Sequence, residues 1–315
     1  MQRSRVSLGK TGLQVSPLGF GASPLGGVFR PIDEEDGVRA VVEAFKSGIN
    51  YFDVSPYYGN TRAETVLGRG LRQLPRDEIV VGTKVGRYGN EFDFSAERVT
   101  RSIDESCARL GVDTLDIVLC HDIEFAQNIE QIVSETIPAL HKFKESGKIR
   151  AIGVSGYPLS VYKYVMSSTS IPTDLILSYC HYNLHDDSLI DMASRMKAQS
   201  GIGVVNASVL SMGLLTQSGC PDWHPAPAEL KAAASKAAQI CAEAGEDLAS
   251  VALRFAFSGA KDVIDATLLG IDSTATLEKN LTTLNEQGDI DPALLEKVLA
   301  VFKPVHNMTW KSGQR

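Results

Sequence analysis

The chain has 315 residues, of which 43% are hydrophobic, and its formal net charge is −7. This composition allows a large buried core and excludes an intrinsically disordered protein. The acidic balance excludes nonspecific binding to nucleic acid or to anionic membranes, which needs a basic surface. No apolar run approaches the roughly 20 residues that a membrane-spanning helix requires.

The cysteines and the first residues indicate a cellular compartment. The five cysteines are scattered and form no C-x-x-C pair, which suits reduced thiols better than a disulfide framework. The opening MQRSRVSLGK lacks the apolar segment of a signal peptide. We therefore expect a cytoplasmic protein with one domain over residues 1–315, a monomer or weak oligomer, without a metal site and without nucleic-acid or membrane partners.

The predicted elements begin with a hairpin and continue as a repeated unit of strand, loop and helix. Residues 4–16 alternate around Lys10-Thr11-Gly12 and predict a small hairpin. Residues 17–22 form a first core strand, and residues 32–47 have the apolar spacing of a helix with acidic residues in its first turn. Further strands are predicted at 49–53, 79–84, 115–120, 149–155, 175–179, 203–208 and 266–270. The helices between and after them are predicted at 63–72, 95–110, 129–146, after Pro158, 188–199, 228–244, 248–257, through Asn280, and at 292–302 before a loose tail.

Eight short apolar strands that alternate with helices are typical of a parallel sheet covered on both faces. Eight such units in about 250 residues predict a (β/α)8 TIM barrel, here with an N-terminal β-hairpin. The rival fold is a doubly wound sheet, whose G-x-G-x-x-G fingerprint would follow the first strand. Gly19 and Gly21 are present there, but Pro24 stands where the third glycine belongs, so we reject this fold.

Ionisable residues follow three successive strands of the predicted barrel. Asp53, Lys84 and His121 lie at the ends of the second, third and fourth strands, and Tyr58 stands just beyond Asp53 in the stretch NYFDVSPYYG. Each has an ordinary alternative role: a helix cap, a lysine that reaches the surface, or simple packing. Because the chemistry of such barrels sits at the C-terminal ends of the strands, their coincidence at one rim favours a catalytic site.

These four residue types suit proton transfer at an alcohol or carbonyl oxygen. A phenol has a pKa near about 10, and the Lys84 ammonium is expected to lower that of Tyr58. Asp53 can hold Lys84 in place and keep it charged, and His121 can hydrogen-bond the reacting oxygen. None of them carries a hydride, so a redox reaction needs a cofactor.

The motifs DVSPYYG, Thr83-Lys84 and LCHD around His121 resemble the aldo-keto reductases, and the resemblance extends over nearly the whole chain, including IGVSGY at 152–157 and LLGIDSTATLEKNL at 268–281. It implies Tyr58 as proton donor or acceptor, supported by Lys84, Asp53 and His121, and a nicotinamide cofactor across the barrel mouth. It implies substrate contacts from Tyr58, His121 and Phe125. The cofactor-binding residues that it implies are Gly21, Asp53, Ser155, Tyr179, Ser208, Leu210, Gly213, Gly270, Asp272, Ser273, Thr276 and Asn280.

The chain departs from the family pattern at three strand ends. The family's Ser-Asn after the fifth strand is Ser155-Gly156, which removes one amide contact to the cofactor's carboxamide. The usual Gln of the sixth strand is Tyr179, and the usual nicotinamide-stacking Tyr of the seventh strand is Ala207. We expect Tyr179 to replace that missing aromatic ring; the alternative is a tyrosine packed in the core.

Asp272 determines the expected cofactor. It aligns with positions where many family members bind the 2′-phosphate of NADP, and a carboxylate there repels phosphate and can accept hydrogen bonds from a ribose hydroxyl. We therefore predict NAD, unless Asp272 only caps the next helix. The expected reaction is NAD-dependent oxidation of the anomeric hydroxyl of a sugar, bound by loops at 87–94, 122–127 and 218–224. Two alternatives remain: an NADP-dependent aldehyde or sugar reductase, and a non-catalytic, cofactor-binding regulatory subunit.

Overall fold

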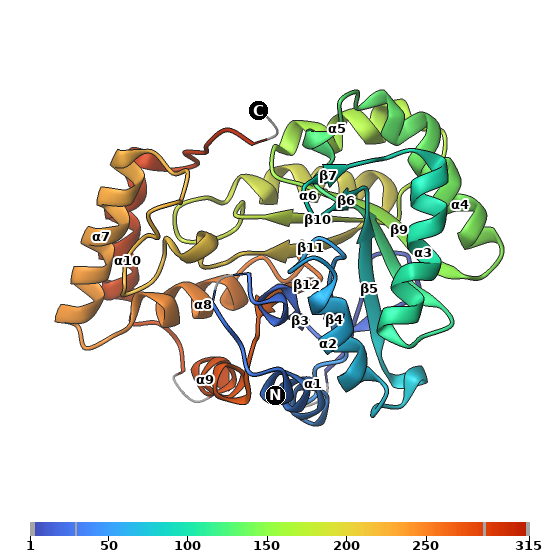
Figure 1. Ribbon diagram of the computed structural model, residues 1–315. Helices are drawn as coiled ribbons and strands as arrows, with labels where there is room; N and C mark the ends of the chain where they lie inside the picture. The colour runs from blue at the N-terminus through green and yellow to red at the C-terminus, as the bar shows by residue number, and fades with distance from the viewer. Residues whose placement is uncertain (1–3, 29, 286–287, 313–315) are drawn as a thin grey trace.

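A closed barrel of eight parallel strands forms the centre of the computed structural model, which describes residues 4–28, 30–285 and 288–312 (Figure 1). The last strand pairs with the first, through Leu268 opposite Gly19 and Gly270 opposite Gly21, and this pairing closes the barrel. The predicted (β/α)8 fold is therefore confirmed. In chain order the strands are β3 (Leu18–Gly21), β4 (Tyr51–Asp53), β5 (Val80–Val85), β8 (Leu115–Cys120), β9 (Ile149–Gly156), β10 (Leu175–Tyr179), β11 (Gly203–Ala207) and β12 (Ala266–Gly270).

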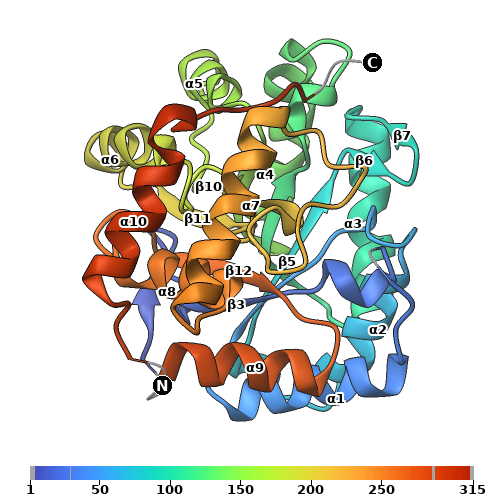
Figure 2. The same ribbon diagram turned by 90° about the vertical axis from the view of Figure 1, so that its left-hand side faces the viewer.

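Helices surround the barrel and bury their apolar faces against it (Figures 1 and 2). Local signals set their ends: the Asp33 side chain accepts hydrogen bonds from the first turn of α1, and Gly111 ends α3 in the left-handed conformation. The α-helices are α1 (Glu34–Lys46), α2 (Arg62–Leu71), α3 (Ala96–Leu110), α4 (Ile137–Glu145), α5 (Leu159–Ser168), α6 (Ser188–Ser200), α7 (Ala228–Glu243), α8 (Leu248–Ser258), α9 (Thr274–Asn285) and α10 (Pro292–Phe302). Shorter turns are η1 (Ser23–Gly26), η2 (Arg76–Glu78), η3 (Ile123–Phe125), η4 (Ile132–Thr136), η5 (Ser211–Gly213) and η6 (Lys303–Val305).

The predicted N-terminal hairpin, β1 (Val6–Ser7) with β2 (Gln14–Val15), closes the bottom of the barrel. Its Leu8 and Leu13 are buried in the same cluster as the inward-facing barrel residues. At its tip Gly9 has a positive φ and packs so closely that a Cβ atom there would lie 2.3 Å from the backbone nitrogen of Gly203. The opposite end of the barrel, where the strands finish, is therefore the open one.

Two local features differ from the expected elements. The helix predicted at 129–146 starts as a π-helical turn, η4, because Pro138 at the start of α4 has no N–H to donate to the preceding turn. The loop after β5 contains a small hairpin, β6 (Arg87–Tyr88) with β7 (Glu91–Phe92), whose strands are too short to leave a periodic pattern.

A second apolar cluster lies outside the barrel. Helices α7 and α10 pack together there and lie side by side in both views (Figures 1 and 2). After α10 the tail returns to the barrel mouth, where Trp310 stacks on Tyr157 at 4.9 Å. The expectation of a loose tail is therefore wrong for residues 303–312. Within the described residues, no helix combines the length and apolar character needed to cross a membrane.

Candidate active site

The four predicted catalytic residues meet at the mouth of the barrel. Strands β4, β5 and β8 are neighbours, so Asp53, Lys84 and His121 emerge side by side. The loop after β4 brings back Tyr58, whose ring lies 5.6 Å from the His121 ring and 5.1 Å from Lys84 Nζ. The arrangement inferred from strand order is thus present in the structure.

Lys84 is a buried cation with fixed partners. Its side chain is 1% exposed, and its ammonium forms an ion pair with Asp53 and donates a hydrogen bond of 2.8 Å to the carbonyl of Val54. Burial lowers the pKa of Lys84, but the charge of Asp53 and the neighbouring Tyr58 more than offset this and raise it. Lys84 therefore remains charged at neutral pH, and Asp53 is its holder, as the sequence predicted.

The pKa of Tyr58 differs from the one that the sequence led us to expect. Burial raises its pKa to about 12, and the lowering by Lys84 only partly counteracts burial and the charges of Asp53 and Asp122. The prediction that Lys84 brings the phenol pKa below its ordinary value is therefore wrong. Burial destabilises the phenolate by more than the attraction of one ammonium stabilises it. At neutral pH Tyr58 is a phenol and a proton donor.

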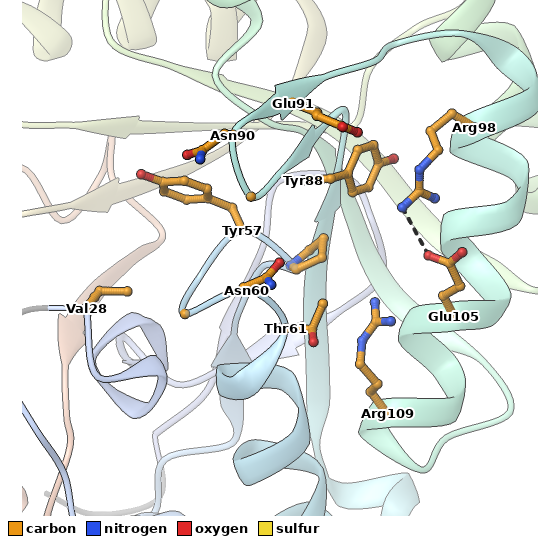
Figure 3. A pocket seen from close by; sticks show the side chains of 13 residues that line it. Val28, Tyr57, Asn60, Thr61, Tyr88, Asn90, Glu91, Arg98, Glu105 and Arg109 are labelled. Carbon is orange, nitrogen blue, oxygen red and sulfur yellow. Dashed lines mark hydrogen bonds and ion pairs between the residues drawn. The ribbon is translucent and has the colours of Figure 1, made fainter.

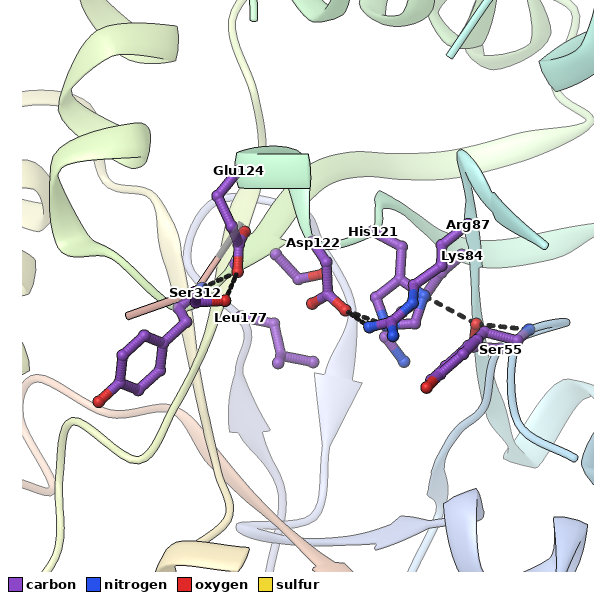
Figure 4. A network of polar contacts seen from close by, with 12 residues as sticks. Ser55, Lys84, Arg87, His121, Asp122, Glu124, Leu177 and Ser312 are labelled. Atoms are coloured by element: carbon purple, nitrogen blue, oxygen red, sulfur yellow. Dashed lines mark hydrogen bonds and ion pairs between the residues drawn. The ribbon is translucent and has the colours of Figure 1, made fainter. Parts of the chain in front are cut away.

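His121 is held neutral and oriented by two neighbours (Figure 4). Burial, followed by the charges of Lys84 and Arg87, lowers its pKa well below the ordinary value. Its Nδ1 is hydrogen-bonded to Ser55 Oγ at 2.9 Å, and its Nε2 lies 3.6 Å from a carboxylate oxygen of Asp122. Ser55 was not predicted, although it lies within DVSPYYG, because its role depends on the position of a strand 66 residues away.

A second ion pair borders the four residues. Arg87, from the unpredicted hairpin, pairs with Asp122, and its guanidinium carbon lies 3.5 Å from the centre of the Tyr57 ring. Tyr57 therefore packs beneath a cation rather than in an apolar core. Arg87 belongs to the loop expected to line the substrate pocket, but its pairing with Asp122 could not be read from the sequence.

The predicted cofactor residues all lie at the same end of the barrel as the four. Gly21 ends β3, Ser155 and Tyr179 lie at the ends of β9 and β10, and the remaining ones follow β11 and β12. In the loop after β11, Ser208 and its neighbours Ser211 and Met212 have positive φ. Such strain in non-glycine residues is common at ligand-binding loops. The loop also carries the predicted contacts Leu210 and Gly213. Gly270 ends β12, and Ser273, Thr276 and Asn280 follow it.

Asp272 lies after β12, buried and fully engaged. Its Oδ2 forms an ion pair of 2.7 Å with Arg30, and its Oδ1 accepts from Thr276 Oγ1 at 2.7 Å and Ser273 Oγ at 3.0 Å. Although burial raises its pKa, these hydrogen bonds hold it below the ordinary value. Ser273, not Asp272, accepts from the backbone N–H of Thr276, so Asp272 is not the cap of α9. Arg30 was not predicted, since 242 residues separate it from Asp272.

Two cavities lie near this end of the barrel. The one of about 330 Å³ is lined by Phe125 and Tyr179, together with Trp223 and the tail residue Trp310. Both predicted contacts, Phe125 to substrate and Tyr179 to nicotinamide, therefore face one space, and their roles stay predictions. A larger cavity of about 850 Å³ lies between the loop after β4, the β6–β7 hairpin and α3 (Figure 3). Neither cavity is lined by Asp53, Tyr58, Lys84 or His121, and the smaller one is the better candidate for substrate because Phe125 and Tyr179 line it.

The histidine-rich segment after β10 is structural. His181 is hydrogen-bonded to Asp186 and to the carbonyl of Tyr157, and the carbonyl of His185 accepts from the backbone of Asn307 in the tail. The hydrogen bond between His185 and Asn307 holds the tail near the barrel mouth. Within the part of the chain that the structure describes, no three His, Cys, Asp or Glu side chains are grouped to hold a metal ion.

Comparison with known proteins identifies the family. A model of the aldo/keto reductase family matches residues 17–293. The chain is 49% identical over 312 residues to an Arabidopsis thaliana protein named L-galactose dehydrogenase, covering 98% of this chain and 97% of that protein. It is 34% identical to D-arabinose 1-dehydrogenase of Saccharomyces cerevisiae, over 95% of this chain and 94% of the relative. A solved aldo-keto reductase of Bacillus halodurans in its holo form superposes with a TM-score of 0.76 over 99% of both chains at 24% identity, which supports the fold. The chain belongs to the aldo/keto reductase family and is an oxidoreductase of the kind that uses a nicotinamide cofactor.

Proposed function

We propose that this protein oxidises the C1 hydroxyl of L-galactose to L-galactono-1,4-lactone with NAD, a step toward ascorbate. The observation that carries the proposal is the group of Asp53, Lys84, Tyr58 and His121 at one mouth, which suits proton transfer at a hydroxyl oxygen. The choice of sugar is supported by the 49% identical relative named L-galactose dehydrogenase, and oxidation at C1 is supported by the second relative, named D-arabinose 1-dehydrogenase.

The residues at the mouth fit a nicotinamide dinucleotide. Asp53 Oδ2 is buried and accepts no hydrogen bond from any described residue, so a ribose hydroxyl of the cofactor could donate to it. Ser208, Leu210 and Gly213 would lie along the pyrophosphate, and the segment from Gly270 to Asn280 would hold the adenosine. When bound, the cofactor supplies the acceptor for the hydride that leaves C1.

In this mechanism the proton and the hydride leave the sugar separately. The C1 hydroxyl proton passes to the Tyr58 oxygen as the C1–H bond breaks, and the C1–O bond becomes the carbonyl of the lactone. Lys84 stabilises the phenolate that must form first, and the neutral His121 donates a hydrogen bond to the reacting oxygen. Because the pKa of Tyr58 is about 12, oxidation should be faster in alkaline solution.

NAD is proposed over NADP on the charges at the adenosine end. Asp272 is ionised there and would repel a 2′-phosphate, and Asp36 accepts a hydrogen bond from Thr274 beside it. The arginines next to these two carboxylates are already paired, Arg30 with Asp272 and Arg39 with Asp36. Comparing KM for NAD and NADP in the wild-type protein tests the preference and separates this proposal from an NADP-dependent reductase.

The decisive experiment is an NADH-absorbance assay across L- and D-sugars. The expected result is turnover of L-galactose with NAD at a higher kcat/KM than other aldoses. Turnover of other sugars alone would contradict the substrate, and an absence of turnover with either cofactor would favour the regulatory-subunit alternative. Detection of the lactone as the product by chromatography would locate the oxidation at C1.

A further inference from the structure

A neutral histidine carries one ring proton, on either Nδ1 or Nε2, and its neighbours decide between the two. His121 is such a ring, because burial, followed by the charges of Lys84 and Arg87, keeps its pKa well below the ordinary value. Its Nδ1 faces Ser55 on the loop after β4, and its Nε2 lies on the side of Asp122 (Figure 4). The ring can therefore donate a hydrogen bond away from Ser55 only if its proton is on Nε2.

The hydroxyl of Ser55 has a defined direction. Ser55 is fully buried, and its Oγ accepts a hydrogen bond of 3.1 Å from the backbone N–H of Tyr57. Among the residues that the structure describes, His121 Nδ1, at 2.9 Å, is the one acceptor with which this hydroxyl forms a hydrogen bond. A buried hydroxyl whose proton has no acceptor is costly, so the O–H of Ser55 donates to Nδ1. Nδ1 is then an acceptor, and the ring proton is on Nε2.

The opposite side of the ring favours the same arrangement. A carboxylate oxygen of Asp122 lies 3.6 Å from Nε2, so an unprotonated Nε2 would turn its lone pair toward a negative charge. Asp122 is held at this place by its ion pair with Arg87. Because 3.6 Å is longer than a hydrogen bond, Asp122 favours a proton on Nε2 but does not bind it. The Nε2–H group remains available to another acceptor.

We propose that Ser55 is a positioning residue, which fixes the proton of His121 on Nε2 and so makes the ring a hydrogen-bond donor to the reacting oxygen. As that oxygen gives its proton to Tyr58, it gains negative charge, and a donor on Nε2 stabilises this charge. With the proton on Nδ1, Nε2 would instead compete with Tyr58 for the hydroxyl proton. The effect on the rate rests on the oxidation proposed above, whereas the place of the proton in the free protein does not.

Nitrogen-15 NMR of the free protein distinguishes the two forms, because protonated and unprotonated ring nitrogens have different chemical shifts. The chain has six histidines, and a His121→Gln variant identifies the signals of His121. In wild type and in Ser55→Thr, which keeps the hydroxyl, we expect the proton on Nε2 alone. In Ser55→Ala the form protonated on Nδ1 should become detectable. A wild-type ring protonated on Nδ1, or unchanged His121 signals in Ser55→Ala, would overturn the proposal.

Rates separate this role from a merely structural one. With a sugar that the protein oxidises, Ser55→Ala should lower kcat by about tenfold, the effect of losing one hydrogen bond, and leave Kd for NAD unchanged. Ser55→Thr should keep most of the wild-type rate, and thermal unfolding verifies the fold of each variant. A lower kcat in Ser55→Ala without a change at His121 would show that Ser55 acts by another route. The expected NMR signals in a protein that oxidises no sugar would support the role of Ser55 and contradict the proposed function instead.

Discussion

Asp53 and Lys84 lie at the ends of β4 and β5 and His121 follows β8, and for these residues the family resemblance implied a catalytic role. Across the mouth, the ends of β9 and β10 carry Gly156 and Tyr179, where the same resemblance led us to expect Asn and Gln. On the first side all three side chains are buried, with Lys84 paired to Asp53 and His121 hydrogen-bonded to Ser55. On the second side, Glu124 of the turn η3 lies next to Gly156, 2.6 Å from where a Cβ atom at that position would be.

The difference follows from what each side must do. Proton transfer needs a particular acid, a particular cation and a particular distance, so a change of residue type removes the chemistry. A hydrogen bond that holds a ligand needs only an acceptor or donor at the right point, and any nearby strand can supply it. The acid–base side should therefore respond to single substitutions far more strongly than the cofactor side.

The largest expected effect is on Tyr58. Tyr58→Phe removes the proton-transfer group and should lower kcat for oxidation by about 10³-fold, with little change in Kd for NAD. The matched control is Tyr57→Phe, which alters the neighbouring ring but leaves the Lys84–Tyr58 contact intact. If Tyr58→Phe oxidised sugar at the wild-type rate, the acid–base assignment would fail.

Replacing Lys84 should lower both the activity and the stability of the protein. Lys84→Met leaves the carboxylate of Asp53 buried without its cation and should cost about 3–5 kcal/mol in the free energy of unfolding, as well as most of the activity. Adding Asp53→Asn should restore much of the stability but no activity. Denaturant unfolding and initial rates measure the two; a Lys84→Met protein as stable as wild type would show that the pair is not desolvated.

At the adenosine end, Asp272→Arg should lower KM for NADP relative to KM for NAD by about tenfold. The substitution replaces a carboxylate that repels the 2′-phosphate by a guanidinium that can bind it. It also frees Arg30 from its ion pair. Arg30→Ala is the opposite control and should sharpen the preference for NAD. A wild-type enzyme that already prefers NADP would refute the electrostatic argument.

Prediction from the sequence succeeded where a signal is local. The apolar periods located the barrel strands and most helices to within a few residues, and strand order alone placed Asp53, Lys84 and His121 at one rim. Prediction failed for the pKa of Tyr58, because burial cannot be weighed against a charge before the surroundings of the phenol are known. It also missed the β6–β7 hairpin, whose two-residue strands are too short for any period.

The sequence by itself determined the fold, the family and the meeting of Asp53, Tyr58, Lys84 and His121 at one rim, because strand periodicity and motif spacing are properties of neighbouring residues. Only the tertiary structure decided which long-range partners these residues meet: Ser55 with His121, Arg30 with Asp272, and Glu124 with Gly156. Those contacts join segments between 32 and 242 residues apart, and barrel closure, not local preference, brings them within hydrogen-bonding distance.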